Sequence, residues 1–320
     1  MTCRIAISII NYRTASMTIE CIRSVLSDIG DLDAHVVVVD NASGDGSADR
    51  IADWIAEQPA DTPVALVRSA SNTGFSGGHN QGMAAIAADH YLLLNSDALL
   101  RTGFLRTVLR AAEANPQAGL IAPRIETEDG EVQVNCFRFH SPWSELIRGA
   151  NSGPVTRLLQ RHVVALQPPV EPAAIEWASF ACIFLRGRMT AEIGPMDEGY
   201  FLYFEDAEYC LRARRAGWGI VQDPRAVAVH FRGGSGPVKA LEKARHRLPP
   251  YFYSSRTRFF RQAHGPMGPV LANLMWSAGR GVAQLRRLTG RAVPPAIEAE
   301  ARDIWTGTLQ PLGPRRAPET

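Results

Sequence analysis

The stretch Tyr91-Leu92-Leu93-Leu94-Asn95-Ser96-Asp97 is an apolar run that stops at three polar residues and ends in a carboxylate. Buried parallel strands are continuous apolar runs of this kind. In an open α/β sheet, ligands bind just beyond the carboxyl ends of such strands. The stretch therefore predicts a buried strand that presents Asp97 at the rim of a crevice, where a carboxylate can hold a hard cation. The alternative is a strand that ends in an Asx turn or a helix cap.

Strand-like and helical segments alternate before this stretch. Residues 4–11, 35–39 and 64–67 are apolar and rich in β-branched side chains, as buried strands are. Between them, residues 15–26 and 48–57 carry apolar side chains at helical spacing. This β-α-β-α-β order predicts an α/β fold with a mostly parallel, doubly wound sheet.

A glycine-rich segment, residues 71–82, follows the third strand. Its four glycines predict a backbone that can approach a ligand closely, and a helix over residues 81–88 would point its free N–H groups at a phosphate or a ribose. The glycines form no Walker pattern and do not follow the first strand, which argues against a dinucleotide-binding Rossmann domain. The alternative is a turn of purely structural use.

The alternation continues to residue 230. The expected elements are a helix at 103–114, a strand at 119–123, a hairpin of 124–127 and 132–137, strands at 175–186, 218–222 and 226–230, and helices at 189–193 and 207–216. In the last helix, Glu208 and Arg212 are spaced for an ion pair, and Gly217 is placed to end it. Residues 141–172 are irregular, which leaves open a loop or short-helix region near a binding site, or a surface insertion.

The totals restrict the class of protein. The chain has 320 residues and a net charge of +2, which is too small to indicate nucleic acid as the main partner. Its five cysteines, Cys3, Cys21, Cys136, Cys182 and Cys210, show no CxxC spacing, which predicts reduced, structural thiols in the cytosol. The start lacks the pattern of a signal peptide, and no run of about 18 uncharged apolar residues is present.

The chain changes character after a flexible break expected at residues 231–237. Arginines interleave with aromatic residues between 245 and 261, and residues 270–288 form an amphipathic helical pattern with basic residues. Such a segment can lie on an anionic membrane surface. The alternative is a helical cap that packs on the rest of the protein.

Polar residues at strand ends are the candidates for chemistry. They are Asp97, the pair Glu205-Asp206, which follows the aromatic run 200–204, and His230. In one α/β sheet these ends can converge on one crevice. Asp97 and His230 suit Mn²⁺ or Mg²⁺, and Asp206 can act as a base, so the set fits displacement of a diphosphate by an activated hydroxyl. The alternatives are a helix N-cap for Asp206 and a buried structural role for His230.

Several motifs together resemble glycosyltransferase family 2, within it the rhamnosyltransferase-like branch. The motifs appear in the family's order over residues 4–236: Ile9-Ile10-Asn11-Tyr12, Val39-Asp40-Asn41-Ala42-Ser43, residues 72–82, Leu94-Asn95-Ser96-Asp97, Met196-Asp197-Glu198, residues 201–212 and His230. The resemblance implies a GT-A glycosyltransferase domain over residues 1–236, which is Rossmann-like, and a basic, aromatic-rich helical extension over 237–320.

The resemblance also implies roles for single residues. Asp206 would be the catalytic base, and Asp97 and His230 would hold a Mg²⁺ or Mn²⁺ ion. The nucleotide-sugar site would comprise Asn11, Asp40, Asn41, Asn72, Gly74, Gly77, Asn80, Asn95 and Asp97. The acceptor side would comprise Trp177, Asp197, Glu198 and Glu205. Asn95 stands where a strict DxD motif has its first carboxylate, which leaves one charge fewer for the metal.

The implied activity is that of an inverting, metal-assisted glycosyltransferase in cell-surface polysaccharide synthesis. It would move a sugar, by the branch resembled L-rhamnose from dTDP-rhamnose, to a hydroxyl of a saccharide or polyprenyl-linked saccharide. The alternatives are a UDP-sugar-dependent transferase of galactofuranosyl, glucosyl or N-acetylhexosaminyl type, and a silent nucleotide-sugar-binding protein. The expected location is the cytoplasm, with peripheral contact on the inner face of the cell membrane through the extension as one alternative.

Overall fold

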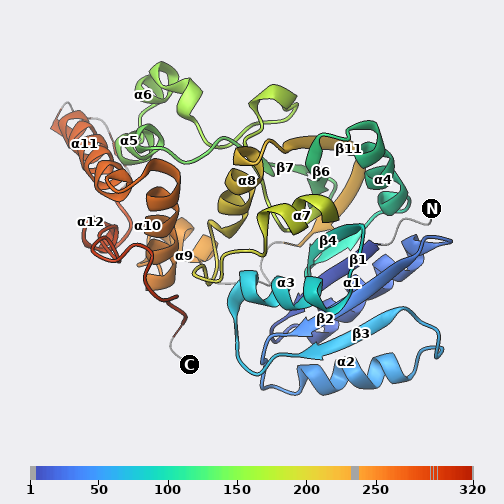
Figure 1. Cartoon of the computed structure of the whole chain (residues 1–320). Coiled ribbons are helices and arrows are strands. Elements are labelled where there is room, and N and C mark those ends of the chain that lie inside the picture. Colours follow the sequence, from blue (N-terminus) through green and yellow to red (C-terminus); the bar gives the residue numbers. More distant parts are fainter. Residues whose placement is uncertain (1–4, 232–237, 289, 291, 294, 319–320) are drawn as a thin grey trace.

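A mixed β-sheet forms the centre of the protein in the computed structural model, which describes residues 5–231, 238–288, 290, 292–293 and 295–318 (Figure 1). The strand order is β3-β2-β1-β4-β10-β6-β11-β5, and β7 pairs with β6. The first four strands are β1 (Ile5–Asn11), β2 (Ala34–Asp40), β3 (Val64–Arg68) and β4 (His90–Asn95). They pair in parallel, as the sequence predicts.

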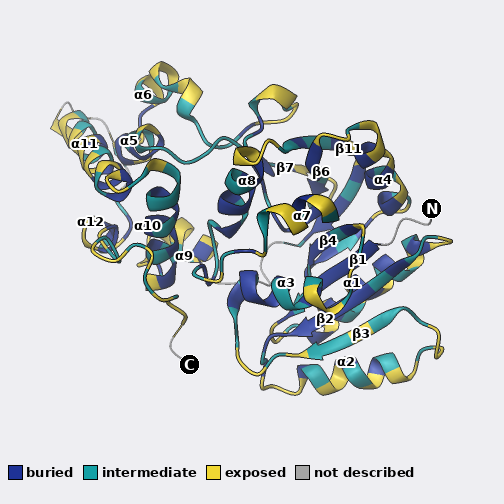
Figure 2. Cartoon of the chain, viewed as in Figure 1, coloured by how far each residue is buried: buried dark blue, intermediate teal, exposed yellow. Residues whose placement is uncertain are grey.

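The helices α1 (Ala15–Ile29), α2 (Ser47–Ala56) and α3 (Gly74–Ala85) connect these strands. The side chains of Ile5, Ile7 and Ile9 in β1 are fully buried, and so are Leu92, Leu93 and Leu94 in β4 (Figure 2). The predicted buried strand at the opening stretch is therefore confirmed, and Asp97 follows its end.

The second half of the sheet is mixed: β11 pairs with β6 in parallel, but the other pairs of this half are antiparallel. Strand β10 (Cys182–Arg186) is antiparallel to both β4 and β6 (Ala118–Glu126). Strand β5 (Ala98–Leu100) is antiparallel to β11 (Gly219–His230), which is one strand where the sequence predicted two. An apolar strand buried on both faces has the same pattern in either direction, so the sequence does not encode its orientation.

The remaining elements of this half follow the prediction more closely. Helices α4 (Phe104–Ala114), α7 (Gly187–Ile193) and α8 (Glu205–Arg215) are present, and β7 (Val132–Gln133) pairs with β6 as the expected hairpin. Residues 175–186 divide between β10 and β9 (Trp177–Ala178), which pairs with β8 (Cys136–Phe137). In α8, Arg212 Nε donates to Glu208 Oε1 at 2.6 Å, as predicted.

The glycine-rich segment is helical rather than a loop, which corrects the expected start at residue 81. Helix α3 begins at Gly74 and lies against β1. A Cβ atom at Gly78 would meet Ile10, and one at Gly82 would overlap the side chain of Ser8. These two glycines therefore serve helix–strand packing, and they do not form the structural turn that was the alternative; a contact of this segment with a nucleotide stays a prediction.

We expect Gly82→Ala to lower the free energy of unfolding by about 1–3 kcal/mol, because the added methyl group overpacks a buried contact with Ser8. Gly281→Ala is the matched control, since a Cβ at this helical glycine meets nothing within 4 Å. We expect the control to gain about 0.5–1 kcal/mol from helix propensity. Urea unfolding of both variants measures the difference, and equal changes would contradict the packing role.

The C-terminal helices gather at one end of the molecule (Figure 1). They are α9 (Val238–Ala244), α10 (Pro250–His264), α11 (Gly268–Leu288) and α12 (Glu300–Asp303). The irregular segment 141–172 contributes α5 (Pro142–Ala150) and α6 (Gly153–Leu158), and two short 3-10 turns lie at Gln160–His162 and Pro172–Ala174. Helix α5 packs along α11, and a Cβ at Gly149 or Gly279 would meet the backbone of the opposite helix.

A buried ion network holds α5 to α10 and α12. Arg256 is 1% exposed and donates to Glu145 Oε2 at 2.9 Å and to Asn273 Oδ1 at 2.8 Å. Arg148 pairs with both Glu145 and Glu300. The segment 141–172 is thus joined to the C-terminal helices, and one of these, α10, packs against α8 (Glu205–Arg215).

The cysteines agree with the expected reduced thiols. Cys21, Cys136, Cys182 and Cys210 are free and buried, and Cys3 lies outside the described residues. The expected flexible break also falls largely outside them, at residues 232–237. In the part of the chain that the structure describes, no helix is long and apolar enough to cross a membrane.

Candidate active site

The carboxyl ends of β1 and β2 bring Asn11 and Asp40 into contact. Asn11 Nδ2 donates to Asp40 Oδ1 at 2.7 Å, and Ser43 Oγ donates to the same oxygen at 2.6 Å. The backbone N–H of Ser43 donates to Asp40 Oδ2 at 3.2 Å. Both side chains are buried, so the protein itself fixes the Asp40 carboxylate. Their contact with a nucleotide stays a prediction.

Asn41 organises the start of α3. Its Oδ1 accepts from the backbone N–H of Thr73 at 2.9 Å, and its Nδ2 donates to Asn72 Oδ1 at 3.1 Å and to Gly74 O at 2.9 Å. Asn41, Asn72 and Gly74, which the sequence predicts to bind the nucleotide sugar, thus form one cluster. Arg315, near the C-terminus, donates to Thr73 O at 2.7 Å.

Asn80 lies apart from that cluster and contacts the predicted acceptor side. Its Nδ2 donates to Glu198 Oε1 at 3.0 Å and to Met196 O at 2.9 Å. Gly77, one turn earlier in α3, lies against the side chains of Thr73 and Glu198. The segment 196–198 is therefore held against α3.

Asp197 is bound by the C-terminal helices. Arg258 donates to both its oxygens, at 2.8 and 2.9 Å, and Gln262 Nε2 donates at 2.9 Å. Burial raises the pKa of Asp197, but the hydrogen bonds from these donors outweigh it, so the pKa lies below its ordinary value. These contacts give Asp197 a structural role. An acceptor role for it and for Glu198 stays a prediction.

Asp97 and His230 meet at the ends of β4 and β11. His230 Nε2 lies 3.2 Å from Asp97 Oδ1 and 3.4 Å from Asn95 Nδ2. All three residues therefore converge as predicted. A carboxylate and an imidazole at this spacing suit Mg²⁺ or Mn²⁺, which take few protein ligands when phosphate oxygens complete the shell. The described residues contain no group of three or more His, Cys, Asp or Glu side chains that would enclose a metal alone.

Glu205 and Asp206 begin α8 after two strained residues and not at a strand end as the sequence predicts, because residues 199–204 form no strand. Tyr203 and Phe204 have φ values of 72° and 70°, the left-handed region that bulky side chains rarely adopt. The N-cap of the helix is Phe204, so Asp206 is not the cap that the alternative predicted. Asp206 Oδ1 accepts instead from Ala207 N at 2.8 Å, and its carboxylate also accepts from the backbone N–H of Phe180.

Burial sets the protonation of this pair. It raises the pKa of Asp206 to about 6, against the lowering effect of the backbone N–H groups. Burial and the neighbouring Asp206 raise the pKa of Glu205 well above its ordinary value, and Glu205 Oε2 has no hydrogen-bond partner among the described residues. Near neutral pH the pair therefore carries one charge, on Asp206.

Trp177 stacks on Phe137 with ring centroids 4.1 Å apart, and its Nε1 donates to Arg138 O at 2.9 Å. The side chain is largely buried, and these contacts give it a place in the core; an acceptor role stays a prediction. His140 lies next to it, 5.0 Å from the Phe204 ring, and burial lowers the His140 pKa to about 4. Sequence reasoning missed His140 and Arg258, since neither belongs to a local motif.

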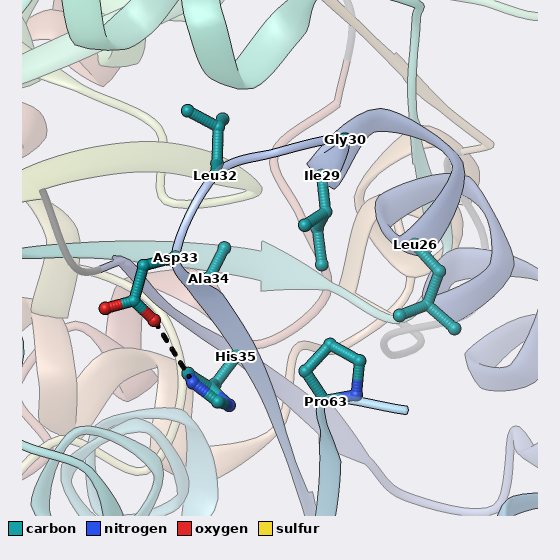
Figure 3. A pocket seen from close by; sticks show the side chains of 8 residues that line it. All are labelled: Leu26, Ile29, Gly30, Leu32, Asp33, Ala34, His35 and Pro63. Carbon is teal, nitrogen blue, oxygen red and sulfur yellow. Dashed lines mark ion pairs between the residues drawn. The ribbon is translucent and has the colours of Figure 1, made fainter. Parts of the chain in front are cut away.

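Two cavities lie away from these residues. One of about 360 Å³ sits at the amino ends of β2 and β3, between Ile29, Ala34 and Pro63, where Asp33 and His35 form an ion pair (Figure 3). The other, of about 670 Å³, is lined by residues of the segment 138–174. Neither is lined by Asp97, Asp206 or His230, so the chemistry of these side chains rather than cavity size identifies the candidate site.

Comparison with known proteins points to one family. Residues 6–151 match the family described as Glycosyl transferase family 2. An N-acetylglucosaminyl-diphospho-decaprenol L-rhamnosyltransferase of Mycobacterium tuberculosis is 28% identical over 235 residues, which cover 68% of this chain and 73% of the relative. A low-salt glycan biosynthesis hexosyltransferase of Haloferax volcanii is 26% identical, over 71% of this chain and 66% of the relative.

A solved structure shares the fold. It is a mannosyltransferase from Pyrobaculum calidifontis in complex with GDP-Man and Mn²⁺, with a TM-score of 0.59 at 16% identity, over 98% of this chain and 82% of the other. At this identity the likeness concerns the fold alone. Residues 6–151, which run from β1 to α5, therefore match a glycosyltransferase family 2 domain, and the chain has the GT-A fold of its solved neighbour.

Proposed function

We propose that this chain is an inverting glycosyltransferase that moves a sugar from a nucleotide-sugar donor to an acceptor hydroxyl. Asp206 is proposed as the base that activates this hydroxyl. One observation carries the proposal: the segment Phe180-Ala181 is bonded to both halves of the site. Phe180 N donates to the Asp206 carboxylate, and Ala181 O accepts from Asn95 N at 2.9 Å. This link between Asp206 and the end of β4 supports Asp206 as the base that acts near Asp97.

Asp97 and His230 would hold a Mg²⁺ or Mn²⁺ ion together with oxygens of the donor diphosphate. When bound, the ion offsets negative charge on the leaving nucleoside diphosphate. Asn95 contributes no charge, and it lies 3.4 Å from His230 Nε2. The Mn²⁺ in the mannosyltransferase complex supports a divalent cation here.

Asp206 would accept the proton of the acceptor hydroxyl while the oxygen of that hydroxyl forms a bond with the anomeric carbon of the donor sugar. The bond between that carbon and the diphosphate oxygen breaks in the same displacement, which inverts the anomeric configuration. Glu205, neutral beside it, leaves Asp206 as the one charged carboxylate of the pair. The N–H groups of Phe180 and Ala207 orient that carboxylate.

The donor is proposed to be dTDP-rhamnose, because a curated relative at 28% identity is an L-rhamnosyltransferase. A UDP-sugar is the alternative donor. The acceptor is a saccharide or a diphospho-polyprenyl saccharide, supported by the name of the same relative. The same proposal includes a catalytic domain over residues 1–236 and a helical extension over 237–320. It also includes a location in the cytoplasm, at the inner face of the cell membrane.

A donor panel tests the activity. The chain is incubated with dTDP-rhamnose, UDP-glucose, UDP-galactofuranose, UDP-N-acetylglucosamine and GDP-mannose, with Mn²⁺ or EDTA, and release of nucleoside diphosphate is followed. Thermal shifts on the same samples report donor binding, because a ligand that binds the folded state stabilises it. We expect turnover and stabilisation with dTDP-rhamnose and Mn²⁺. If no donor were hydrolysed or used for transfer, the proposal that this chain is an enzyme would be wrong.

The rate of transfer should fall below pH 6. Asp206 must be deprotonated to accept a proton, and its pKa is raised to about 6 by burial. The kcat/KM is therefore expected to rise about tenfold per pH unit from pH 4.5 to 5.5 and to level off above pH 6.5. The raised pKa favours the folded state at low pH, and this contribution is lost as the pH rises through 6. A rate independent of pH down to 4.5 would exclude Asp206 as the base.

A further inference from the structure

The segment 311–318 lies against the residues at the start of α3. Arg315 Nη1 donates to the backbone oxygen of Thr73 at 2.7 Å, although the two residues are 242 positions apart in the sequence. The backbone N–H and the hydroxyl of Thr73 both donate to Asn41 Oδ1, at 2.9 and 3.1 Å. The segment is therefore in direct contact with the cluster that the sequence predicts to bind the nucleotide sugar.

A second contact fixes the same segment. Arg258 Nη1 donates to the backbone oxygen of Gly313 at 3.2 Å. The other two nitrogens of this guanidinium bind Asp197, so a single side chain joins the segment to a residue predicted on the acceptor side. The position of Arg315 is thus set by contacts on both the predicted nucleotide side and the predicted acceptor side.

The guanidinium of Arg315 keeps most of its capacity for hydrogen bonds. A guanidinium carries several N–H donors on three nitrogens, and only Nη1 is engaged by Thr73. Among the described residues this is the only polar contact of Arg315, and no acidic side chain of those residues pairs with it. The side chain is half-buried and fixed. A guanidinium in this state suits phosphate oxygens, whose geometry matches its planar fork.

The backbone at the start of α3 has fewer donors to offer. Its N–H groups already have partners within the protein: Thr73 N donates to Asn41 Oδ1 at 2.9 Å, Gly74 N to Asn72 Oδ1 at 3.0 Å and Phe75 N to Phe201 O at 2.8 Å. These three groups are therefore not available to a phosphate, and a nucleotide bound at this cluster needs a donor from elsewhere. Arg315 is placed to supply it.

We propose that Arg315 binds the nucleoside diphosphate of the donor, with the free N–H groups of its guanidinium donating to phosphate oxygens. This role rests on the proposed function, since it takes the cluster at the start of α3 as part of the donor site. It also means that residues 237–320 complete the donor site, because a residue of the helical extension touches the nucleotide.

A purely structural role for Arg315 is the alternative. The bond to Thr73 would then serve only to tie the segment 311–318 to α3. Loss of that bond would lower the melting temperature of the ligand-free protein, and the affinity for a nucleotide would stay the same. A binding measurement therefore separates the two roles.

Calorimetric titration of the full chain with dTDP and with UDP, in the presence of Mn²⁺, tests the proposal. We expect Arg315→Ala to raise the Kd about tenfold or more, which is the usual effect of losing a hydrogen bond to a charged group. Arg315→Lys keeps the charge without the planar fork and should show a smaller increase. Donor turnover should show a raised KM at nearly unchanged kcat, because Arg315 contacts the nucleotide and not the reacting atoms.

Arg316→Ala is the matched control. Arg316 is the next residue, its side chain is exposed, and it makes no hydrogen bond or ion pair with another described residue. Its replacement should leave the Kd within about twofold, since exposed charges contribute little. A Kd for Arg315→Ala equal to that of the unmodified chain would overturn the proposal. So would an equal increase in Arg316→Ala, which would indicate a general effect of charge, or no binding of either nucleotide to the unmodified chain.

Failure of the proposed function would give a different result. In that case the unmodified chain binds dTDP or UDP and Arg315→Ala binds it more weakly, but no sugar is transferred from any donor. Conversely, normal transfer with an unchanged donor KM in Arg315→Ala would leave the enzyme activity in place and exclude Arg315 from the donor site.

Discussion

Asp206→Asn is expected to lower kcat by about 10²–10⁴-fold, the contribution of a positioned general base. The amide keeps the shape of the side chain and can still accept from the backbone N–H groups of Ala207 and Phe180. It cannot take the proton of the acceptor hydroxyl. Release of nucleoside diphosphate in the presence of an acceptor measures the loss, and the thermal shift with donor should remain.

Asp223→Asn is the control for this substitution. Asp223 is likewise a carboxylate with little exposure, but it pairs with Arg225 in β11 and is not among the converging strand-end residues. We expect its kcat to stay within about twofold of the unmodified chain, because Asp223 pairs with the exposed Arg225 and such pairs contribute little. Near-normal turnover by Asp206→Asn would exclude the base assignment, whereas a loss of donor-induced stabilisation would show a disturbed fold instead.

Glu145→Ala is expected to lower the free energy of unfolding by about 3–5 kcal/mol, because it leaves a buried guanidinium without its counter-charge. Arg256 is 1% exposed, and its remaining partner would be the neutral Asn273. Burial opposes ionisation of Glu145, but Arg148 and Arg256 outweigh it and lower its pKa to about 2. Urea unfolding followed by circular dichroism measures the change.

Two further variants make this prediction specific. Asp49→Ala removes one partner of the exposed pair with Arg68 and should cost less than about 1 kcal/mol. The double replacement Glu145→Leu/Arg256→Met should recover most of the loss, because apolar side chains of similar volume need no counter-charge. If Glu145→Ala unfolded like Asp49→Ala, the ion network would not be what joins α5 to α10.

Much of the fold and of the site could be read from local pattern. Apolar runs that end in polar residues identified β1, β2 and β4 and the polar positions at their ends, Asn11, Asp40 and Asp97. The convergence of Asp97 with His230 was also predictable, because strands of one sheet that end in polar residues can share an edge. The Glu208–Arg212 pair follows from helix geometry alone.

Local pattern could not supply the contacts between distant segments. Local pattern predicts a helix only from residue 81, but α3 begins at Gly74, and its Gly78 and Gly82 lie close to Ile10 and Ser8 of β1. Asp197 was expected on the acceptor side, and Arg258, 61 residues later, binds both its oxygens. The sequence around Asp197 does not indicate Arg258, and the sequence around Arg258 does not indicate Asp197.

The sequence by itself determined that Leu92–Leu94 is buried and that a carboxylate follows it, because an apolar run and the polar residues that end it are adjacent in the chain. Only the tertiary structure decided that β10 runs against β4, that Phe180-Ala181 bonds both Asn95 and Asp206, and that the leucines of α11 face outward. The physical reason is that apolar residues occur on both sides of β10 and of α11. Pairing with β4 and β6 sets the direction of β10, and packing against α5 sets which face of α11 is covered.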